Sequence, residues 1–429
     1  MGLAFYWALG AIGPDAILRA KRGQPDIARE FLKLVHYIDN LDHLVYSTIP
    51  LKKAPWLDLG GGFAQFMRDI LDHDRYDEFH QGISVRFKGD LLKVPAFCVA
   101  GWNDVLLGPN LEHFQGIKKN GGSDLARNKS RIMIGPWAHA GFLPYVGELD
   151  YGLSTSFLLL ELERGLTPLH LQWFDYWLKG IENGITDEAP VKIFRMGENK
   201  WRDEQEWPLA RTQFTNYYLH GRGKANTRHG DGHLSPEMPA REKPDRFTYD
   251  PQNPVPTRGG NILMTANRIR GPVEQGPLEK RDDILVYTTG TLEKEVEVTG
   301  PVRVRLFAAS SATDTDFTAK LVDVFPDGRI YNLADGIIRA RYRNGYEAPT
   351  LIRPEAVYEY EIDLWATSNL FKAGHRIGVE ISSSNFPRFD RNLNTGKLGK
   401  DSSELVAAQQ TVFHTDQYPS HIVLPIIPR

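Results

Sequence analysis

Two short apolar runs constrain the fold of this chain most, because each ends in a turn that carries a titratable side chain. The first run, residues 94–100, breaks at a Gly-Trp-Asn-Asp turn that ends in Asp104. The second, residues 131–134, breaks at a Gly-Pro-Trp-Ala-His turn that ends in His139. Apolar runs of this length, joined by an amphipathic segment, are typical of parallel strands in a sheet covered on both faces. Because ligands gather at the carboxyl ends of such strands, we expect Asp104 and His139 to lie close together there.

An aspartate followed by a histidine indicates two members of an acid–base–nucleophile triad. In the α/β-hydrolase order the serine comes first, in a Gly-x-Ser-x-Gly turn between a strand and a helix. The chain contains no such turn. The nearest match, Gly-Leu-Ser-Thr-Ser at residues 152–156, lacks the last glycine, follows His139 and has no strand pattern before it. We therefore expect the nucleophile to be missing from these residues.

Length and charge narrow the possible classes of protein. A chain of 429 residues is long enough for two or three domains, and a net charge of −3 gives no reason to expect nucleic acid or an anionic membrane as partner. No apolar run reaches the roughly 18 residues that span a bilayer. The apolar start, residues 3–9, lacks a basic flank and is interpreted as a core helix rather than a signal peptide, which predicts a cytoplasmic protein. The single cysteine, Cys98, excludes an intrachain disulfide and is interpreted as a packed thiol.

Residues 1–91 show helical patterns. Asp26 is placed as the N-cap of a helix that turns one apolar face inward, with Phe31, Leu34, Val35 and Ile38 on that face. A second helical pattern runs near residues 63–70. The acids and histidines at 73–77 do not share one face, so this segment is interpreted as a loop rather than a metal site.

Residues 92–188 contain the two predicted strands, a crossover helix and a further helix. Leu111, Phe114 and Ile117 recur every three residues and indicate the crossover that parallel strands require. In the later helix we place Thr167 as N-cap, Pro168 as the first residue and Gly180 just past the end. Its apolar stripe is interpreted as core, and consists of Leu169, Trp173, Tyr176 and Trp177.

From about residue 189 the apolar period changes from 3.6 to 2. Alternating runs near 302–306, 358–364 and 377–381 are divided by turns that contain Gly and Pro. Many strands with one polar face predict a β-sandwich, specifically a jelly roll. Residues 221–282 are polar and rich in Gly, Pro and Asp, so we expect long loops there. A set of charged residues is interpreted as a structural network against the hydrolase part rather than a metal or sugar site: Asp314, Asp316, Asp323, His375 and Arg376.

Several long motifs resemble those of one family. They are Gly-Trp-Asn-Asp at 101–104, Gly-Pro-Trp-Ala-His at 135–139, Met-Gly-Glu-Asn-Lys-Trp-Arg at 196–202, Asp-Thr-Asp-Phe-Thr-Ala-Lys-Leu at 314–321, Gly-His-Arg-Ile at 374–377 and Ser-Asn-Phe-Pro-Arg-Phe-Asp-Arg-Asn at 384–392. These motifs resemble the cocaine esterase and X-Pro dipeptidyl-peptidase family of serine hydrolases, most closely the cocaine esterase branch. The resemblance covers essentially the whole chain.

The resemblance implies a fold class of α/β plus all-β. It predicts a helical cap at residues 1–91, the carboxyl-terminal half of an α/β-hydrolase domain at 92–188 and a jelly-roll β-sandwich at 189–429. It assigns the triad carboxylate to Asp104 and the triad imidazole to His139. Members begin with a half that carries the serine elbow and an oxyanion-binding tyrosine, so the chain is expected to start just inside the cap. The missing half then belongs to a longer product or to another chain.

The resemblance also suggests which residues contact substrate. Amino-acid ester hydrolases of the family carry acidic residues two and three positions after the triad aspartate, where this chain has Leu106 and Leu107. An ammonium buried beside two leucines would lack a partner, which favours an uncharged, apolar acyl group. A jelly-roll segment of the cocaine esterase branch reaches the acyl pocket, and by this likeness Leu263 and Met264 are carried over as substrate-binding residues.

The sequence thus predicts a carboxylesterase that works through an acyl-enzyme, with no metal or organic cofactor. The expected partner is a small acyl ester or amide, and a homodimer and a missing amino-terminal segment are left open. Two alternatives remain: an X-Pro dipeptidyl-peptidase or β-lactam acylase, and a non-catalytic fragment or binding protein built on a jelly roll. Without its serine the chain alone is expected to be inactive, with an unpaired strand edge and a bare apolar face.

Overall fold

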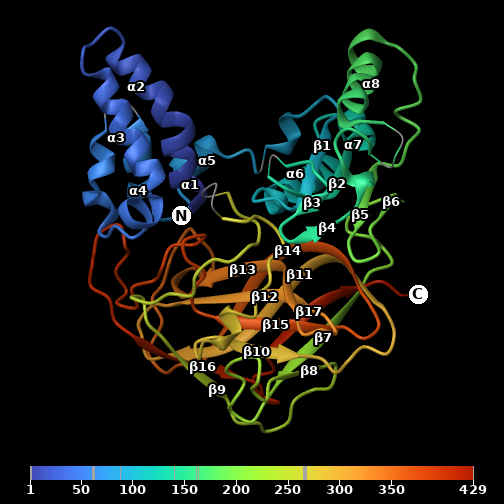
Figure 1. Cartoon of the computed structure of the whole chain (residues 1–429). Helices are drawn as coiled ribbons and strands as arrows, with labels where there is room; N and C mark the ends of the chain where they lie inside the picture. The colour runs from blue at the N-terminus through green and yellow to red at the C-terminus, as the bar shows by residue number, and fades with distance from the viewer. Residues whose placement is uncertain are drawn as a thin grey trace.

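The computed structural model describes the backbone of residues 2–59, 63–86, 88–139, 141–160, 162, 164–263 and 268–428. A group of amino-terminal helices and an α/β layer stand side by side on a large β-sandwich (Figure 1). None of the described helices is both long enough and apolar enough to cross a membrane. Within the same residues, no group of three or more His, Cys, Asp or Glu side chains could hold a metal ion.

The amino-terminal helices pack around their own core, which includes the fully buried Tyr46 and Trp56. They are α1 (Gly2–Trp7), α2 (Gly13–Lys21), α3 (Ile27–Asp39), α4 (Phe63–Asp72) and α5 (Glu78–Ile83), with π-helical turns at Ala8–Ile12 and Leu41–Tyr46. This region rests on sandwich loops through backbone bonds such as Leu51 N–H to the Gly399 carbonyl, 3.0 Å. The helices therefore belong to one packed unit that adjoins the sandwich.

Helix α3 differs from its prediction in two details. Asp26 precedes the helix but makes no capping bond, because its carboxylate accepts from Lys21 Nζ at 3.0 Å instead. Leu34 is buried as predicted, whereas Val35 is exposed, so the inward face is narrower than the apolar pattern suggested. The apolar spacing shows which side chains share one face of the helix, but not how much of that face other elements cover.

The α/β layer holds the two strands that the apolar runs predict. Strand β1 (Phe97–Asn103) pairs in parallel with β2 (Arg131–Ala138), in register from Phe97 opposite Arg131 to Gly101 opposite Gly135. Helix α6 (Leu107–Asn120) connects them, followed by the short α7 (Asp124–Lys129), and buries its predicted residues Leu111, Phe114 and Ile117. Burial raises the pKa of the Cys98 thiol to about 11, which agrees with a packed, unreactive cysteine.

Two further strands extend this sheet beyond the predicted boundary at residue 188. The strand order is β1-β2-β5-β6, with β5 (Val191–Arg195) parallel to β2 and β6 (Lys200–Glu204) antiparallel to β5. The strands within residues 191–204 therefore belong to the first sheet, and Met196, between them, also bridges to Asn369 of the sandwich. The sequence could not show this, since strands of either sheet alternate with period 2. The division into three domains stays a prediction.

Helix α8 (Leu166–Lys179) packs on one face of this sheet, and the opposite side of the helix is exposed. Gly180 ends the helix in the left-handed conformation, as predicted, but the N-cap is Gly165 and not Thr167. Trp173 is buried, whereas Leu171, Phe174 and Leu178 are exposed along the outer face. Strand β1 also lies at the edge of the sheet as described.

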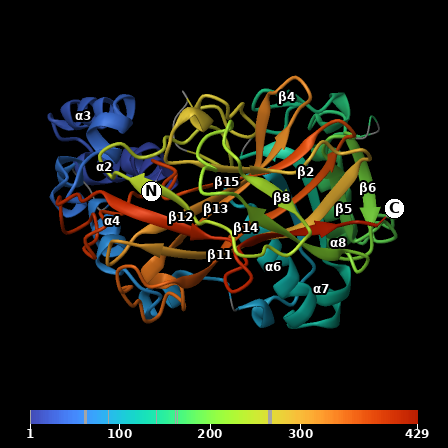
Figure 2. The ribbon, with the colours of Figure 1, turned by 90° about the horizontal axis from the view of Figure 1, so that it is seen from below.

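The strands of the sandwich, seen from below in Figure 2, enclose one large core. These are β7 (Gln213–His220), β8 (His233–Ser235), β9 (Asp245–Tyr249), β10 (Leu285–Thr288), β11 (Val296–Ser310), β12 (Asp316–Val324), β13 (Ile330–Arg339), β14 (Tyr358–Phe371), β15 (Arg376–Ser382), β16 (Ala408–Phe413) and β17 (His421–Ile426). The long antiparallel pair β11–β14 places Val304 opposite Ile362 and Leu306 opposite Tyr360, all fully buried. The predicted alternation is therefore the inner face of the sandwich.

Two glutamates are buried side by side in the sandwich without hydrogen-bond partners for their carboxylate oxygens among the described residues, Glu279 and Glu380. Lys320 Nζ lies 3.3 Å from a Glu380 oxygen. Burial, reinforced by the Glu380 carboxylate, raises the pKa of Glu279 to about 9. The pair of Glu279 and Glu380 therefore keeps a proton at pH values where exposed glutamates are ionised.

The difference in stability between Glu279→Gln and the wild type is expected to shift in favour of the variant as pH rises, because the wild type loses stability. Glu279 ionises in the unfolded chain near its ordinary pKa of 4.5 but in the folded chain only near 9. Its contribution to stability is therefore complete below about pH 4.5 and is lost progressively up to about pH 9. Melting temperatures at pH 5 and pH 8.5 measure this, with the exposed Glu293→Gln as control. A difference between Glu279→Gln and wild type that does not grow with pH would contradict it.

Candidate active site

Asp104 and His139 meet at the carboxyl ends of the neighbouring strands β1 and β2. His139 Nδ1 lies 3.1 Å from Asp104 Oδ1 and 3.2 Å from Oδ2. Figure 1 shows the two strands side by side in the α/β layer, above the sandwich. The structure thus confirms the predicted meeting of a carboxylate and an imidazole.

The two predicted turns are largely the last residues of β1 and β2, and these segments approach each other closely because residue 101 is glycine. A Cβ at Gly101 would lie 2.1 Å from the Trp137 carbonyl oxygen, so no other residue fits there. The Asn103 side chain then donates to the Pro136 carbonyl at 2.7 Å, which joins the end of β1 to the end of β2. The indole N–H of Trp137 donates to the Thr155 carbonyl at 2.7 Å, and Trp137 is buried. Packing and backbone contacts therefore fix the spacing of the two turns.

The surroundings of Asp104 and His139 suit a base held in one tautomer. Asp104 Oδ1 also accepts from the Leu106 backbone N–H at 2.7 Å, where α6 begins. The Asp104 side chain is 15% exposed and the His139 side chain 32%, so the carboxylate is the more enclosed of the two. A carboxylate facing Nδ1 holds the ring proton there and leaves Nε2 for a reacting group.

The four predicted substrate-binding residues differ in how much of their surface a substrate could contact. Leu106 is 39% exposed beside Asp104, whereas Leu107 is 1% exposed within the core of the α/β layer. Leu107 therefore offers a substrate almost no surface. Leu263 is partly buried in the loop before β10, and Met264 lies outside the described residues.

Ser154, in the imperfect Gly-x-Ser-x-Gly match, lies in a 3-10 turn at Leu153–Thr155. Its backbone carbonyl accepts from the Trp201 indole at 2.8 Å. The strand before this turn, β4 (Leu149–Asp150), is two residues long and pairs with β3 (Tyr145–Val146), outside the sheet that carries β1 and β2. The structure thus gives no support for Ser154 as a nucleophile.

Asn261 and Arg270 lie in the sandwich loop between β9 and β10, and each contacts the backbone near one of the two site residues. Neither residue was predicted from the sequence. Asn261 Nδ2 donates to the carbonyls of Trp102 and Asp104, at 3.0 and 2.9 Å. Arg270 Nη1 donates to the His139 carbonyl at 2.8 Å. The only signal in the sequence was the general likeness of this loop to one that reaches an acyl pocket.

The Asn261→Asp variant is expected to lose about 2–4 kcal/mol of stability. Asn261 is buried, and the substitution replaces an amide donor by a carboxylate that faces two carbonyl oxygens. Urea denaturation measures the loss. Asn110→Asp is the matched control, since Asn110 Nδ2 also donates to a backbone carbonyl but at the surface. Equal losses in the two variants would show that Asn261 does not hold the turn.

Comparison with known proteins agrees with this geometry. A family model described as X-Pro dipeptidyl-peptidase (S15 family) matches residues 51–141, and one described as X-Pro dipeptidyl-peptidase C-terminal non-catalytic domain matches residues 183–423. Cocaine esterase of Rhodococcus sp. (strain MB1 Bresler) is 40% identical over 97% of this chain and 71% of its own length. A putative Xaa-Pro dipeptidyl-peptidase of Bacillus anthracis is 28% identical over 54% of this chain and 35% of its own.

Solved structures show the same fold. An aminopeptidase from a marine sediment Thaumarchaeota archaeon is 27% identical, with a TM-score of 0.73 over 85% of this chain and 60% of its own. An α-amino acid ester hydrolase is 23% identical, with a TM-score of 0.72 over 89% of this chain and 65% of its own. The chain therefore spans less than two thirds of either of these two chains.

Proposed function

Because this chain belongs to the cocaine esterase and X-Pro dipeptidyl-peptidase family of serine hydrolases, we propose that Asp104 and His139 serve a serine nucleophile in carboxylic ester hydrolysis. The observation that carries the proposal is the contact of His139 Nδ1 with both Asp104 oxygens at the ends of parallel strands. This is the relation between base and orienting carboxylate that acyl transfer requires.

The mechanism follows from the tautomer that Asp104 imposes. His139 Nε2 takes the proton of the serine hydroxyl while the serine oxygen bonds to the ester carbonyl carbon. The imidazolium is stabilised by Asp104 and returns the proton to the leaving alcohol as the acyl–oxygen bond breaks. Water then attacks the acyl-enzyme with His139 again as base, which releases the carboxylic acid and restores the serine.

The surroundings of Asp104 favour an uncharged acyl group. Leu106, two positions after Asp104, is the exposed member of the predicted leucine pair and presents an apolar surface beside the carboxylate. An α-amino acyl group would bring an ammonium to this surface without a carboxylate at that position. The X-Pro dipeptidyl-peptidase family models support a second candidate, cleavage of a peptide after proline, which uses the same acyl transfer.

We infer that the serine comes from a segment that these 429 residues do not contain, since the sequence has no Gly-x-Ser-x-Gly turn. The edge of β1 and the exposed Leu171, Phe174 and Leu178 of α8 provide a place for such a segment to pair and pack. A non-catalytic binding protein is the rival interpretation, and it would need no such segment.

The purified 429-residue chain is expected not to hydrolyse p-nitrophenyl butyrate above the uncatalysed rate. Loss of a nucleophile costs about 10⁶ in turnover, and the oxyanion donor that follows it is lost as well. Co-expression with a serine-bearing amino-terminal segment of a family member is expected to restore turnover. A spectrophotometric assay of both samples checks this.

The matched control is the same segment with its serine replaced by alanine, which should restore folding but not turnover. Turnover by the 429-residue chain alone would refute the inference that its nucleophile is missing. A correctly associated pair of chains without turnover on butyrate, acetate or X-Pro anilide substrates would favour the binding protein instead.

A further inference from the structure

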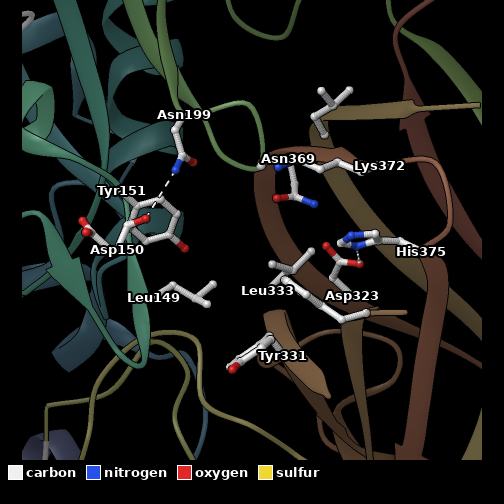
Figure 3. A pocket seen from close by; sticks show the side chains of 13 residues that line it. Leu149, Asp150, Tyr151, Asn199, Asp323, Tyr331, Leu333, Asn369, Lys372 and His375 are labelled. Atoms are coloured by element: carbon white, nitrogen blue, oxygen red, sulfur yellow. Dashed lines mark hydrogen bonds and ion pairs between the residues drawn. The ribbon is translucent and has the colours of Figure 1, made fainter. Parts of the chain in front are cut away.

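A cavity of about 200 Å³ lies where the α/β layer meets the sandwich (Figure 3). Strand β4, Tyr151 and Asn199 line one side, and strands β12, β13 and β14 with His375 line the other. Neither Asp104 nor His139 lines it. We propose that this cavity binds a small, uncharged molecule with several hydroxyl groups, such as a polyol or a monosaccharide.

Two buried polar groups in the lining leave a hydrogen-bond donor unused among the described residues. Tyr151 is 4% exposed, and its hydroxyl points into the cavity (Figure 3). The Asn103 amide, which donates to the Pro136 carbonyl, also lies beside this hydroxyl; as a donor it can engage only the hydroxyl oxygen, so the hydroxyl proton stays free. Asn369 is 3% exposed, and its amide contacts the Asp323 carboxyl, which engages at most one of its two N–H groups.

Such groups are informative because buried polar atoms in folded proteins nearly always have a partner. Oxygen atoms of a ligand in the cavity would accept from Tyr151 on one wall and from Asn369 on the other. The cavity therefore offers two unused donors from opposite walls.

The cavity also offers an acceptor. His375 Nδ1 lies 2.8 Å from Asp323 Oδ1, and both residues are buried. The carboxylate holds a ring proton on Nδ1, which leaves Nε2 as the ring atom that can accept from a ligand hydroxyl. A hydroxyl group both donates and accepts, and a ligand with several hydroxyls satisfies Tyr151, Asn369 and His375 together.

Charge and size argue for a neutral ligand no larger than one sugar ring. In the lining Asp323 is paired with His375, and the remaining charges are one carboxylate, Asp150, and one ammonium, Lys372. No excess of either sign is left to favour an ionic ligand. About 200 Å³ lies below the roughly 300 Å³ at which pockets for drug-sized ligands begin. Leu149, Leu333 and Leu370 supply apolar walls for the C–H groups of such a molecule.

Saturation-transfer NMR with the full 429-residue chain tests the proposal, with D-xylose and erythritol as probes and sodium propionate as the charged comparison. At least one hydroxylated probe is expected to bind saturably. The Tyr151→Phe variant should weaken that binding about fivefold or more through one lost hydrogen bond. Its melting temperature should change little, because the hydroxyl donates to no protein group among the described residues.

Two further variants separate the cavity from the rest of the surface. Leu149→Trp, which places an indole at the cavity wall, should abolish binding. Tyr145→Phe, which removes an exposed hydroxyl six residues away in the sequence, should leave it unchanged. The proposal is overturned if neither hydroxylated probe binds saturably, if Tyr151→Phe binds as the wild type does, or if propionate binds as tightly as the sugar.

Discussion

The His139→Ala variant is expected to lose about a millionfold of the ester turnover that the chain shows together with a serine-bearing segment. Alanine cannot take the serine proton, so the nucleophile stays neutral and the leaving alcohol finds no acid. Because His139 Nδ1 lies within 3.2 Å of both Asp104 oxygens, the base and its orienting carboxylate act as one unit. Initial rates with p-nitrophenyl butyrate measure the loss.

A second variant makes the result specific to the triad. Asp104→Asn is expected to lose about 10⁴ in turnover, less than His139→Ala, because the amide disfavours the required tautomer but leaves the base in place. His229→Ala, on an exposed loop of the sandwich, is the control and should keep full activity. Turnover that survives His139→Ala within tenfold would remove both residues from the mechanism, even if the family assignment stands.

The sequence predicted the two strands that carry the site because short apolar runs determine where such strands form. A short apolar run forms a buried strand wherever it is covered, but β1 does not break at Gly101 as predicted: it continues through Trp102 and ends at Asn103, just before Asp104. Parallel pairing of β1 with β2 then places Asp104 beside His139 without any information from the rest of the chain.

The contacts from the sandwich could not be predicted in this way. Asn261 lies 157 residues from Asp104 in the sequence, and Arg270 lies 131 residues from His139. Neither residue type nor spacing distinguishes them from other polar loop residues. Leu107 shows the same limit: its position after Asp104 suggested a substrate contact, but the first turn of α6 points it into the core.

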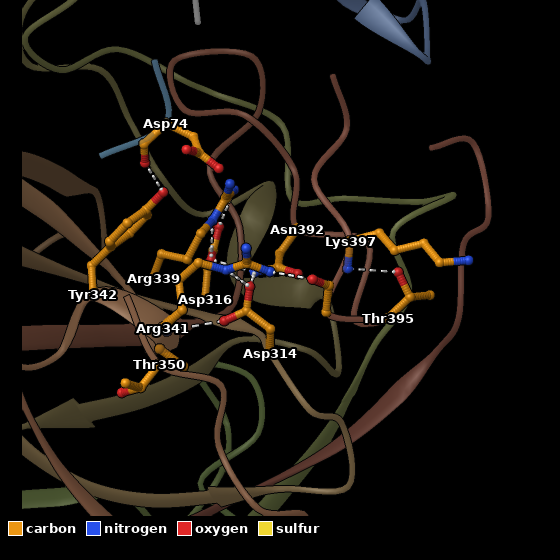
Figure 4. A network of polar contacts seen from close by, with 12 residues as sticks. Asp74, Asp314, Asp316, Arg339, Arg341, Tyr342, Thr350, Asn392, Thr395 and Lys397 are labelled. Atoms are coloured by element: carbon orange, nitrogen blue, oxygen red, sulfur yellow. Dashed lines mark hydrogen bonds and ion pairs between the residues drawn. The ribbon is translucent and has the colours of Figure 1, made fainter. Parts of the chain in front are cut away.

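A buried polar network shows how the sandwich holds the long loop after β15 (Figure 4). Asp314 accepts from the Arg341 backbone at 3.0 Å and from Arg341 Nε at 2.8 Å, and it also accepts from Asn392 Nδ2 at 3.0 Å. Asp316 accepts from Arg339 Nε at 2.9 Å. The interpretation of these charges as structural agrees with the contacts, but this part of the network adjoins the helices, since the Tyr342 hydroxyl donates to the Asp74 carbonyl.

The Asp314→Ala variant is expected to lose about 3–5 kcal/mol of stability. Asp314 is completely buried, and its removal leaves the buried Arg341 guanidinium without its carboxylate and Asn392 without an acceptor. An unpaired buried charge costs far more than the pair gains, because the desolvation penalty is no longer offset. Urea denaturation followed by circular dichroism of the β-sheet measures the change.

Asp327→Ala is the matched control, since Asp327 pairs with Arg329 in an exposed turn and should cost far less stability than Asp314→Ala. The double variant Asp314→Ala/Arg341→Met should recover part of the loss, because it removes the stranded charge as well. If the double variant is less stable than Asp314→Ala alone, hydrogen bonds from Arg341 to other groups, such as the Gly396 carbonyl at 2.6 Å, outweigh the unpaired charge. The loop after β15 would then be held by Arg341 itself rather than by its pairing with Asp314.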